Sequence, residues 1–330
     1  MQPSLAVGAF SSLAIDKDGF LHVVYFQDNN DVVWYAHDDH GKWLFDYVQG
    51  QVGQGFHLSL SLDQDGNPHI AYNNVKTKKR SAYLWYRSLL ETGWSGPFRE
   101  NTSPLTNTDV SLSLSQDGTA HFSYQAMDDF SIMYAQFNQA TGFDSQKVDY
   151  ASDGCQSFPI AVDHDGGVHL CYCSQNGLSY AVLSEQEWQI VVVDPSESAG
   201  VFSEIALDDL GNPHIAYYDS GAGVLRYARL VGDSWEISLV DQNGHVGQYP
   251  SIAIDSQGNA HISYYDVQNS ALKYALQNGS QWIVETIDNS GDVGMFNSIG
   301  LDPFSGEPRI SYFDAGREDL KIAWAARRDQ

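Results

Sequence analysis

One short motif, a histidine followed three residues later by a tyrosine, recurs along the chain at nearly constant spacing. Successive histidines are separated by 47, 52, 48, 45 and 47 residues, and an arginine takes the seventh place after a further 48. The pairs are His22/Tyr25, His69/Tyr72, His121/Tyr124, His169/Tyr172, His214/Tyr217, His261/Tyr264 and Arg309/Tyr312. A repeat period of roughly 40 to 50 residues is typical of propellers and related arrays, so this recurrence constrains the fold more than any other feature.

Each repeat is interpreted as four short strands. In the sixth repeat, residues 251–254, 261–265, 271–275 and 282–287 are strand-like and are separated by turn residues. The 19 Tyr, 15 Phe and 8 Trp favour strands over helices. The sequence therefore predicts an all-β fold, a seven-bladed β-propeller built from four-stranded antiparallel blades.

The repeat boundaries predict one propeller domain that covers residues 1–330. We place the blades at approximately residues 11–56, 57–108, 109–157, 158–201, 202–249, 250–296 and 297–330. The last repeat lacks a fourth strand. Either the last blade has three strands, or residues 3–7 of the N-terminus close it.

The repeats resemble those of a known group of proteins. Segments 250–255 (PSIAID), 258–266 (GNAHISYYD) and 272–275 (LKYA), together with Trp282, are similar to tandem repeats of the sialidase-like (BNR) propellers of secreted or surface bacterial proteins. The resemblance implies the propeller architecture and an extracellular or cell-surface location. It does not imply sialidase activity, because the chain has no Ser-x-Asp-x-Gly-x-x-Trp box. Residues 1–10 show no secretory signal pattern.

The charge balance bounds the choice of partners. The chain has 17 Lys and Arg against 42 Asp and Glu, a formal net charge of −25. Such an acidic protein repels a phosphate backbone, so we expect no nucleic-acid partner. No apolar run is long enough for a membrane span. We expect a glycan or protein partner, and the sequence carries no signal for an oligomeric state.

The repeated histidines predict a structural role. Residues that recur in every blade lie far apart around a ring, so they cannot form one site. An aspartate stands six residues before five of the six histidines, as in Asp208 and His214, and we expect the two side chains to pair across a tight turn. The tyrosine lies on the opposite strand face and is expected to pack on the adjoining blade.

The sequence gives little indication of a metal site or of a reactive cysteine. The Asp-x-Asp-Gly turns at 16–19 and 63–66 carry calcium-type ligands but lack the further ligands of a calcium loop, so we interpret them as turns and predict no metal site or cofactor. Cys155, Cys171 and Cys173 cannot all pair. We interpret them as small buried core residues.

Function is expected where the repeats diverge. The ends of the second strands and the loops that enter the first strands share one face at the channel mouth, where they carry acids, amides and aromatic rings suited to a polyol. The incoming loops also bring Phe10, His57 and Phe158 to this face. The ligand-binding candidates are Asp28, Asn74, Asp219, Tyr265, Asp266, Asp314, Phe202, Tyr249 and Phe296. The alternative is that these rings fill space between blades and that the acids end solvated turns.

Three classes of function remain open. The first is a non-catalytic propeller that recognises a glycan or another small polar ligand. The second is a scaffold for protein partners. The third is a carbohydrate-active enzyme, a glycosidase or polysaccharide lyase, with Glu204 as the catalytic candidate because it stands where most repeats have serine in the first strand.

Overall fold

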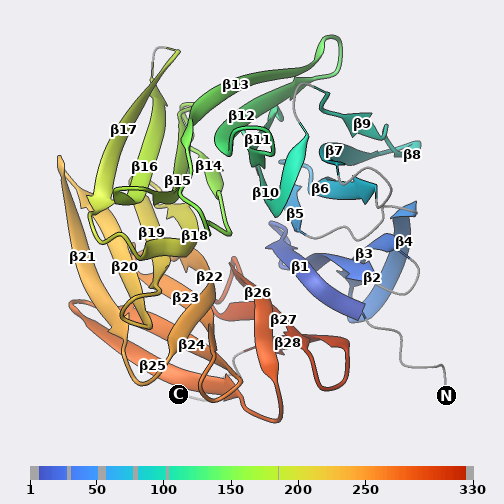
Figure 1. Ribbon diagram of the computed structural model, residues 1–330. Helices are drawn as coiled ribbons and strands as arrows, with labels where there is room; N and C mark the ends of the chain where they lie inside the picture. The colour runs from blue at the N-terminus through green and yellow to red at the C-terminus, as the bar shows by residue number, and fades with distance from the viewer. Residues whose placement is uncertain are drawn as a thin grey trace.

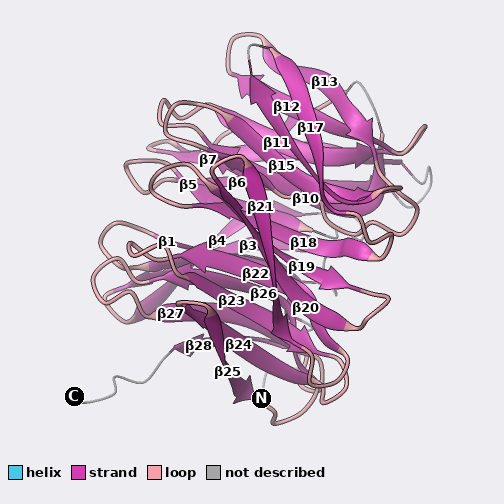
Figure 2. Cartoon of the chain, turned by 90° about the vertical axis from the view of Figure 1, so that its left-hand side faces the viewer, coloured by secondary structure: helices cyan, strands magenta, loops and turns pink. Residues whose placement is uncertain are grey.

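The chain forms a ring of β-sheets around a central channel, as Figure 1 shows. The computed structural model describes residues 7–27, 31–50, 57–76, 81–101, 104–184 and 186–324, with the backbone alone at 7, 74–76, 81 and 106–108. All regular elements in this part of the chain are strands. In the view of Figure 2 the connecting loops gather on two sides of the ring.

Every blade runs outward from an innermost first strand. Blades 1 to 3 comprise β1 (Val7–Ile15), β2 (Leu21–Gln27), β3 (Val32–Asp39) and β4 (Lys42–Gly50); β5 (Leu58–Leu62), β6 (Pro68–Lys76), β7 (Ser81–Leu90), β8 (Gly93–Trp94) and β9 (Phe98–Arg99); and β10 (Leu105–Leu114), β11 (Ala120–Ala126), β12 (Ser131–Asn138) and β13 (Gly142–Tyr150). Blades 4 and 5 comprise β14 (Ile160–Val162), β15 (Val168–Ser174), β16 (Gly177–Ser184) and β17 (Glu187–Asp194); and β18 (Ala199–Leu207), β19 (Pro213–Asp219), β20 (Val224–Val231) and β21 (Ser234–Asp241). Blades 6 and 7 comprise β22 (Val246–Ile254), β23 (Ala260–Asp266), β24 (Ala271–Asn278) and β25 (Gln281–Asp288); and β26 (Val293–Leu301), β27 (Pro308–Asp314) and β28 (Asp319–Trp324).

The predicted all-β propeller is confirmed, with antiparallel blades that are mostly four-stranded. Blades 2 and 3 are joined into one larger sheet by a single pairing of Leu105 with Ala82. The last sheet has three strands in the described part of the chain. Val7 pairs with Gln27 in the first blade, while residues 3–6 of the predicted closing strand lie outside the described residues.

The core is divided among the joints between blades rather than gathered at one centre. At the joint of blades 5 and 6, Leu225 and Val240 pack with Val246 and Tyr264, all at most 7% exposed. The hydroxyl of Tyr264 donates a hydrogen bond to Oδ2 of Asp241 in the preceding blade, at 2.7 Å. Equivalent bonds join Tyr172 to Asp149, Tyr217 to Asp194 and Tyr312 to Asp288. The predicted packing of this tyrosine series on the adjoining blade is confirmed.

The repeated histidines also lie where the sequence predicts. Nε2 of His169 is 3.2 Å from Oδ2 of Asp163, and its Nδ1 is 2.6 Å from the hydroxyl of Tyr180 on the third strand. The other aspartate oxygen accepts hydrogen bonds from the backbone of the turn at Asp165 and Gly167. Each such triad therefore ties a hairpin turn to the second and third strands of its own blade.

Candidate functional site

Seven equivalent residues, one from each blade, surround one mouth of the channel. They lie two residues before the position at which most first strands carry serine. Together they line a cavity of about 180 Å³. They are Phe10, His57, Asp109, Ser157, Phe202, Tyr249 and Phe296.

Five of the seven carry rings that form a continuous arc, named here the aromatic crescent. Its members in ring order are His57, Phe10, Phe296, Tyr249 and Phe202. Successive ring centroids are 5.0, 4.1, 4.8 and 4.6 Å apart. All five side chains keep part of their surface exposed. The rings of the crescent are therefore accessible from the lumen and are not fully buried between blades.

The backbone is bent to bring four of these rings into the channel. Phe10, His57, Tyr249 and Phe296 have φ between 51° and 72°, in the left-handed region that bulky side chains rarely adopt. In blades 1, 6 and 7 this residue sits where the pairing of the first and second strands is irregular. Strain of this kind clusters at functional sites, which makes this mouth the candidate site of the molecule.

A second row of rings supports the crescent from outside. Tyr218 lies 6.4 Å from Phe202, and Tyr265 lies 6.4 Å from Tyr249, between ring centroids. Both supporting tyrosines are buried. The Tyr265 hydroxyl donates a hydrogen bond to Asp292 at 2.6 Å, so the supporting ring is fixed in place.

The opposite side of the mouth is polar. This polar sector consists of Asp109, Gln156, Ser157 and Glu204. Oδ1 of Asp109 is 3.3 Å from Nδ1 of His57, which joins the polar sector to one end of the aromatic crescent. Oγ of Ser157 accepts a hydrogen bond from the backbone N–H of Ser203 at 2.7 Å. The mouth is thus amphipathic, with rings on one side and hydrogen-bonding groups on the other.

Serine hydroxyls of the first strands lie deeper in the same channel. Oγ of Ser251 accepts a hydrogen bond from the backbone N–H of Ile299 in the next blade at 3.1 Å. The same bond joins Ser298 to Leu13, Ser12 to Leu60, Ser59 to Leu112 and Ser111 to Ile160. These bonds fix each first strand to its neighbour and hold the mouth residues above them.

Glu204 occupies one of these serine positions and has an unusual acidity. Burial in the channel wall raises the pKa of its carboxyl to about 8, and the negative charge of Asp109 adds to the effect. The side chain still keeps some exposed surface because it faces the lumen. At neutral pH the group is therefore mostly protonated and can donate as well as accept a hydrogen bond.

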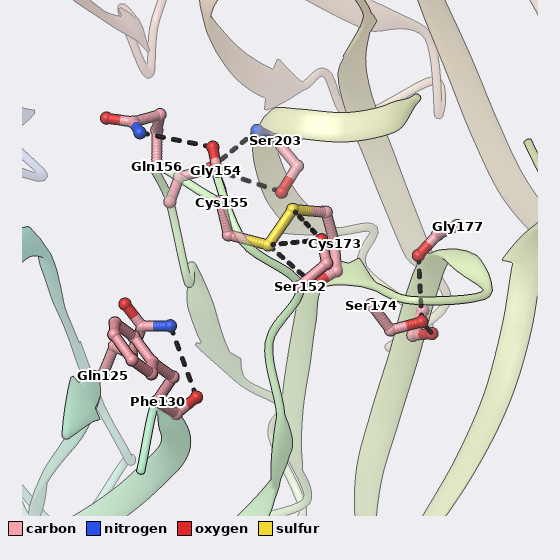
Figure 3. The surroundings of a disulfide bond; sticks show 12 residues. Gln125, Phe130, Ser152, Gly154, Cys155, Gln156, Cys173, Ser174, Gly177 and Ser203 are labelled. Carbon is pink, nitrogen blue, oxygen red and sulfur yellow. Dashed lines mark hydrogen bonds between the residues drawn. A yellow bond between two sulfur atoms is a disulfide. The ribbon is translucent and has the colours of Figure 1, made fainter. Parts of the chain in front are cut away.

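A disulfide joins Cys155 to Cys173 at the mouth, which corrects the interpretation of all three cysteines as free thiols. Their Cα atoms are 5.7 Å apart, whereas Cys171 is free and buried. The repeat pattern predicts the strands of the blade but not the path of the loop between β13 and β14, which brings Cys155 next to Cys173. Figure 3 shows the bridge beside Gln156 and Ser203, so it fixes the loop that carries Gln156 and Ser157 of the polar sector.

The structure separates the predicted site residues into two groups. Phe202, Tyr249 and Phe296 line the cavity, as does Glu204, and Tyr265 stands behind them. The three acids that end second strands are instead buried and lie outside the cavity lining, where they bond neighbouring groups. Asp219 accepts from Ser198 and Arg226, Asp266 from Asn269, and Asp314 contacts Lys321 at 2.8 Å.

Two further candidates are less fully described. Asp28 lies outside the described residues, and Asn74 is described only by its backbone pairing with Tyr83.

Phe158 is fully buried between blades, because it stands one residue after the mouth position of its blade. Asp109 and Ser157 were not among the predicted site residues. Their position in the repeat identifies them, because each lies two residues before the first-strand serine or its equivalent.

The described residues show neither a metal-binding cluster nor a membrane-spanning helix. No group of three or more His, Cys, Asp or Glu side chains is placed to hold a metal ion there. Within the same residues, no helix has the length and hydropathy needed to cross a bilayer.

Solved structures with the same fold come from proteins of several kinds. Hydrazine synthase of Kuenenia stuttgartiensis matches 99% of this chain and 97% of its own at 10% identity, with a TM-score of 0.65. An ulvan lyase bound to -[GlcA(1-4)Rha3S]- matches 98% and 96% at 12% identity, with a TM-score of 0.63. The SapL1 lectin in complex with α-methyl fucoside matches 86% and 97% at 12% identity, with a TM-score of 0.62.

These likenesses show the fold alone. No protein-family model matches the chain, and no curated protein matches it. The chain is a seven-bladed β-propeller with an amphipathic channel mouth.

Proposed function

We propose that the protein binds a neutral glycan at the channel mouth without cleaving it. The observation that carries this proposal is the division of the cavity into the aromatic crescent and the polar sector. Ring faces stack on the C–H surfaces of sugars, while hydroxyl, amide and carboxyl groups bond sugar hydroxyls. The lectin of similar fold that is solved with α-methyl fucoside supports the choice of a sugar.

The charge of the cavity favours a neutral ligand. Among the described residues that line it there is no lysine or arginine, and there are two acids, Asp109 and Glu204. The chain as a whole carries a formal charge of −25. A uronate or sulfate group would therefore find no lysine or arginine in the cavity to balance its charge, and the acidic chain as a whole would repel it. Acidic polysaccharides such as the one bound to the ulvan lyase are disfavoured.

The size of the cavity favours a small unit. At about 30 Å³ of liquid volume per molecule, 180 Å³ holds about six waters. A cavity of this volume fits one sugar ring better than several linked sugar rings. We infer that the mouth takes a terminal residue of a glycan, with the rest of the chain outside.

We place the protein outside the cell or on its surface. Disulfides persist in oxidising compartments and are rare in the cytosol. The Cys155–Cys173 bridge supports this location.

A glycan array of neutral sugars, followed by calorimetry with the strongest hit, tests the proposal. Phe296→Ala should weaken binding about tenfold because it removes one stacking face from the centre of the crescent. Phe304→Ala is the matched control, since Phe304 is 77% exposed on the turn at the far end of the same first strand. An array without hits, together with capture of a defined protein partner, would favour the scaffold function.

Glycoside hydrolysis is the second candidate. The mouth holds two carboxyl groups, Asp109 and the mostly protonated Glu204, and glycosidases use such a pair as acid and base. The test is release of reducing ends from the glycans that bind. Release that disappears in Glu204→Gln while binding remains would replace the proposal of binding alone.

A further inference from the structure

The charge of the channel mouth suits a cation even better than a neutral sugar. Among the described residues that line the cavity there are two carboxyl groups, Asp109 and Glu204, and no lysine or arginine. The chain as a whole carries a formal charge of −25. A cleft lined by charge of one sign concentrates ligands of the opposite sign and raises their rate of association. A cation is therefore drawn to this mouth, whereas a neutral ligand gains nothing from the field.

The same cavity holds four carbocyclic rings of the aromatic crescent, Phe10, Phe296, Tyr249 and Phe202. The planes of successive rings are tilted by 41°, 60° and 47°. Rings in a flat stack would cover one another's faces, whereas tilted rings that line one cavity leave part of each face open. The face of an aromatic ring is the negative end of its quadrupole and attracts cations.

The rings are held in place without a ligand. Phe10, Tyr249 and Phe296 have φ of 58°, 51° and 52°, a conformation that persists only where the surrounding structure imposes it. Tyr265 and Phe313, which lie outside the cavity lining, have ring centroids 6.4 Å from those of Tyr249 and Phe296. Because the rings are already ordered, a ligand that binds to them pays little of the usual cost of immobilising side chains.

The balance between rings and acceptors indicates the kind of cation. A primary ammonium group has three N–H donors, each of which needs an acceptor. Of the two acids in the cavity, Asp109 has Oδ1 at 3.3 Å from Nδ1 of His57, and Glu204 is mostly protonated at neutral pH. A quaternary ammonium group has no N–H donor and is recognised chiefly by aromatic faces. Four rings and few charged acceptors therefore favour a quaternary ammonium group.

We propose that the channel mouth also binds a small quaternary ammonium cation of the choline class. The trimethylammonium group lies against Phe10, Phe296 and Tyr249, and the hydroxyl end of the ligand reaches the polar sector. This inference goes beyond glycan binding and does not rest on it. The two ligands use the same rings, so each excludes the other from the mouth.

Calorimetry of the intact protein with choline chloride tests the proposal. Saturable binding to a single site is expected. The second probe is the uncharged analogue of choline, in which a tert-butyl group replaces the trimethylammonium group and the shape is nearly the same. It should bind about tenfold more weakly, because it lacks both the attraction to the ring faces and the attraction to the acidic mouth.

Substitutions at the rings separate attraction to a ring face from apolar contact. Phe296→Leu keeps an apolar side chain and removes the aromatic face, so the affinity for choline should fall about fivefold while that for the uncharged analogue stays nearly the same. Tyr249→Leu should act in the same way and replaces Phe296→Leu if that variant does not fold. Phe304→Leu is the matched control, since Phe304 is 77% exposed on the turn after β26 and lies outside the cavity lining.

The dependence on pH gives an independent readout. Glu204 gains its charge as the pH rises through about 8, so the affinity for choline should rise between pH 7 and pH 9. The other titratable groups near Glu204 are His57, Asp109 and Tyr249 in the cavity lining and the buried Cys171. Glu204→Gln should abolish the rise, because it removes the titration of this one group.

Phosphocholine distinguishes a lipid headgroup from a free cation. It carries the same trimethylammonium group with an added phosphate, which the acidic mouth repels, so it should bind more weakly than choline. Tighter binding of phosphocholine would overturn the choice of a free cation.

Three further outcomes would overturn the proposal. They are the absence of saturable choline binding, equal affinity for choline and its uncharged analogue, and an affinity for choline that Phe296→Leu and Tyr249→Leu both leave unchanged. A glycan that binds where choline does not would sink this inference alone. Choline that binds where no glycan does would sink the proposed function alone.

Discussion

The Nδ1 atom of His214 lies 2.5 Å from the hydroxyl oxygen of Tyr227, while its Nε2 atom lies 3.6 Å from Oδ2 of Asp208. The imidazole is buried, and His214 is not among the residues that line the cavity. His214→Ala should therefore lower the free energy of unfolding by about 2 kcal/mol and leave glycan affinity unchanged. Thermal unfolding and calorimetry check both parts. The control is His164→Ala at an exposed turn, and a loss of affinity in His214→Ala would contradict the structural role.

Blade 3 offers the reverse experiment. Ser115 stands where the other histidine-bearing blades have aspartate, and Nε2 of His121 is buried without a hydrogen-bond partner among the described residues. Ser115→Asp should supply the partner and raise the free energy of unfolding by about 1 kcal/mol. The neighbouring Asp117 is no obstacle, because Asp63 and Asp65 share the same spacing in blade 2. A lower melting temperature of the variant would refute the pairing.

Stability should fall as the pH drops below neutral. Burial lowers the pKa of all six repeated histidines below the ordinary 6.5, so the unfolded chain takes up protons first. The stability is complete above pH 6.5 and is lost as the pH falls toward the folded pKa values. Aspartates such as Asp208 act in a separate window below pH 4, since their pKa lies below 3.8 in the folded chain. Melting curves of the Glu204→Gln variant from pH 8 to pH 5 check this, because the raised pKa of Glu204 gives the native protein an opposite dependence in the same range. A flat profile of the variant would contradict the prediction.

Glu204 should show the opposite dependence. Its pKa of about 8 exceeds the ordinary 4.5, so its contribution to stability is present at low pH and is lost as the pH rises between these values. Glu204→Gln cannot ionise, so at pH 9 it should be more stable than the native protein by about 2 kcal/mol. Unfolding at pH 5 and pH 9 checks the sign, and an equal difference at both would refute the raised pKa.

The disulfide should support both the stability and the site. The double variant Cys155→Ala, Cys173→Ala opens a bridge between residues 18 apart, and the chain-entropy model predicts a loss of about 3 kcal/mol. Glycan affinity should also fall, because Gln156 and Ser157 are then held less firmly. Cys171→Ala is the control for a buried thiol outside the bridge. Unchanged glycan affinity in the double variant would show that the disulfide does not support the binding site.

The fold was predictable because every repeat carries the same pattern of strands and turns. The pairing of Asp163 with His169 and the contact of Tyr264 with the neighbouring blade follow from position in the repeat, and seven copies remove the ambiguity of any single one. The aromatic members Phe202, Tyr249 and Phe296 were found at the mouth for the same reason.

The polar side of the mouth was harder to predict. Asp219, Asp266 and Asp314 look free in the sequence, but partners such as Arg226 and Lys321 come from the next strand across the hairpin. Asp109 gives no signal by residue type, since five of the other six mouth residues carry rings. Contacts across the channel depend on the closure of the ring, and strand patterns carry no information about them.

The serine bond from Ser298 to Leu13 joins the last blade to the first in the same way as Ser251 to Ile299 joins two consecutive blades. Chain connectivity is therefore not what closes the inner ring. A circular permutant whose backbone is opened at another joint, with the present ends linked, would keep the same inner hydrogen bonds. The order of the blades along the chain and the hydrogen bonds that join the inner strands are therefore independent properties of this molecule.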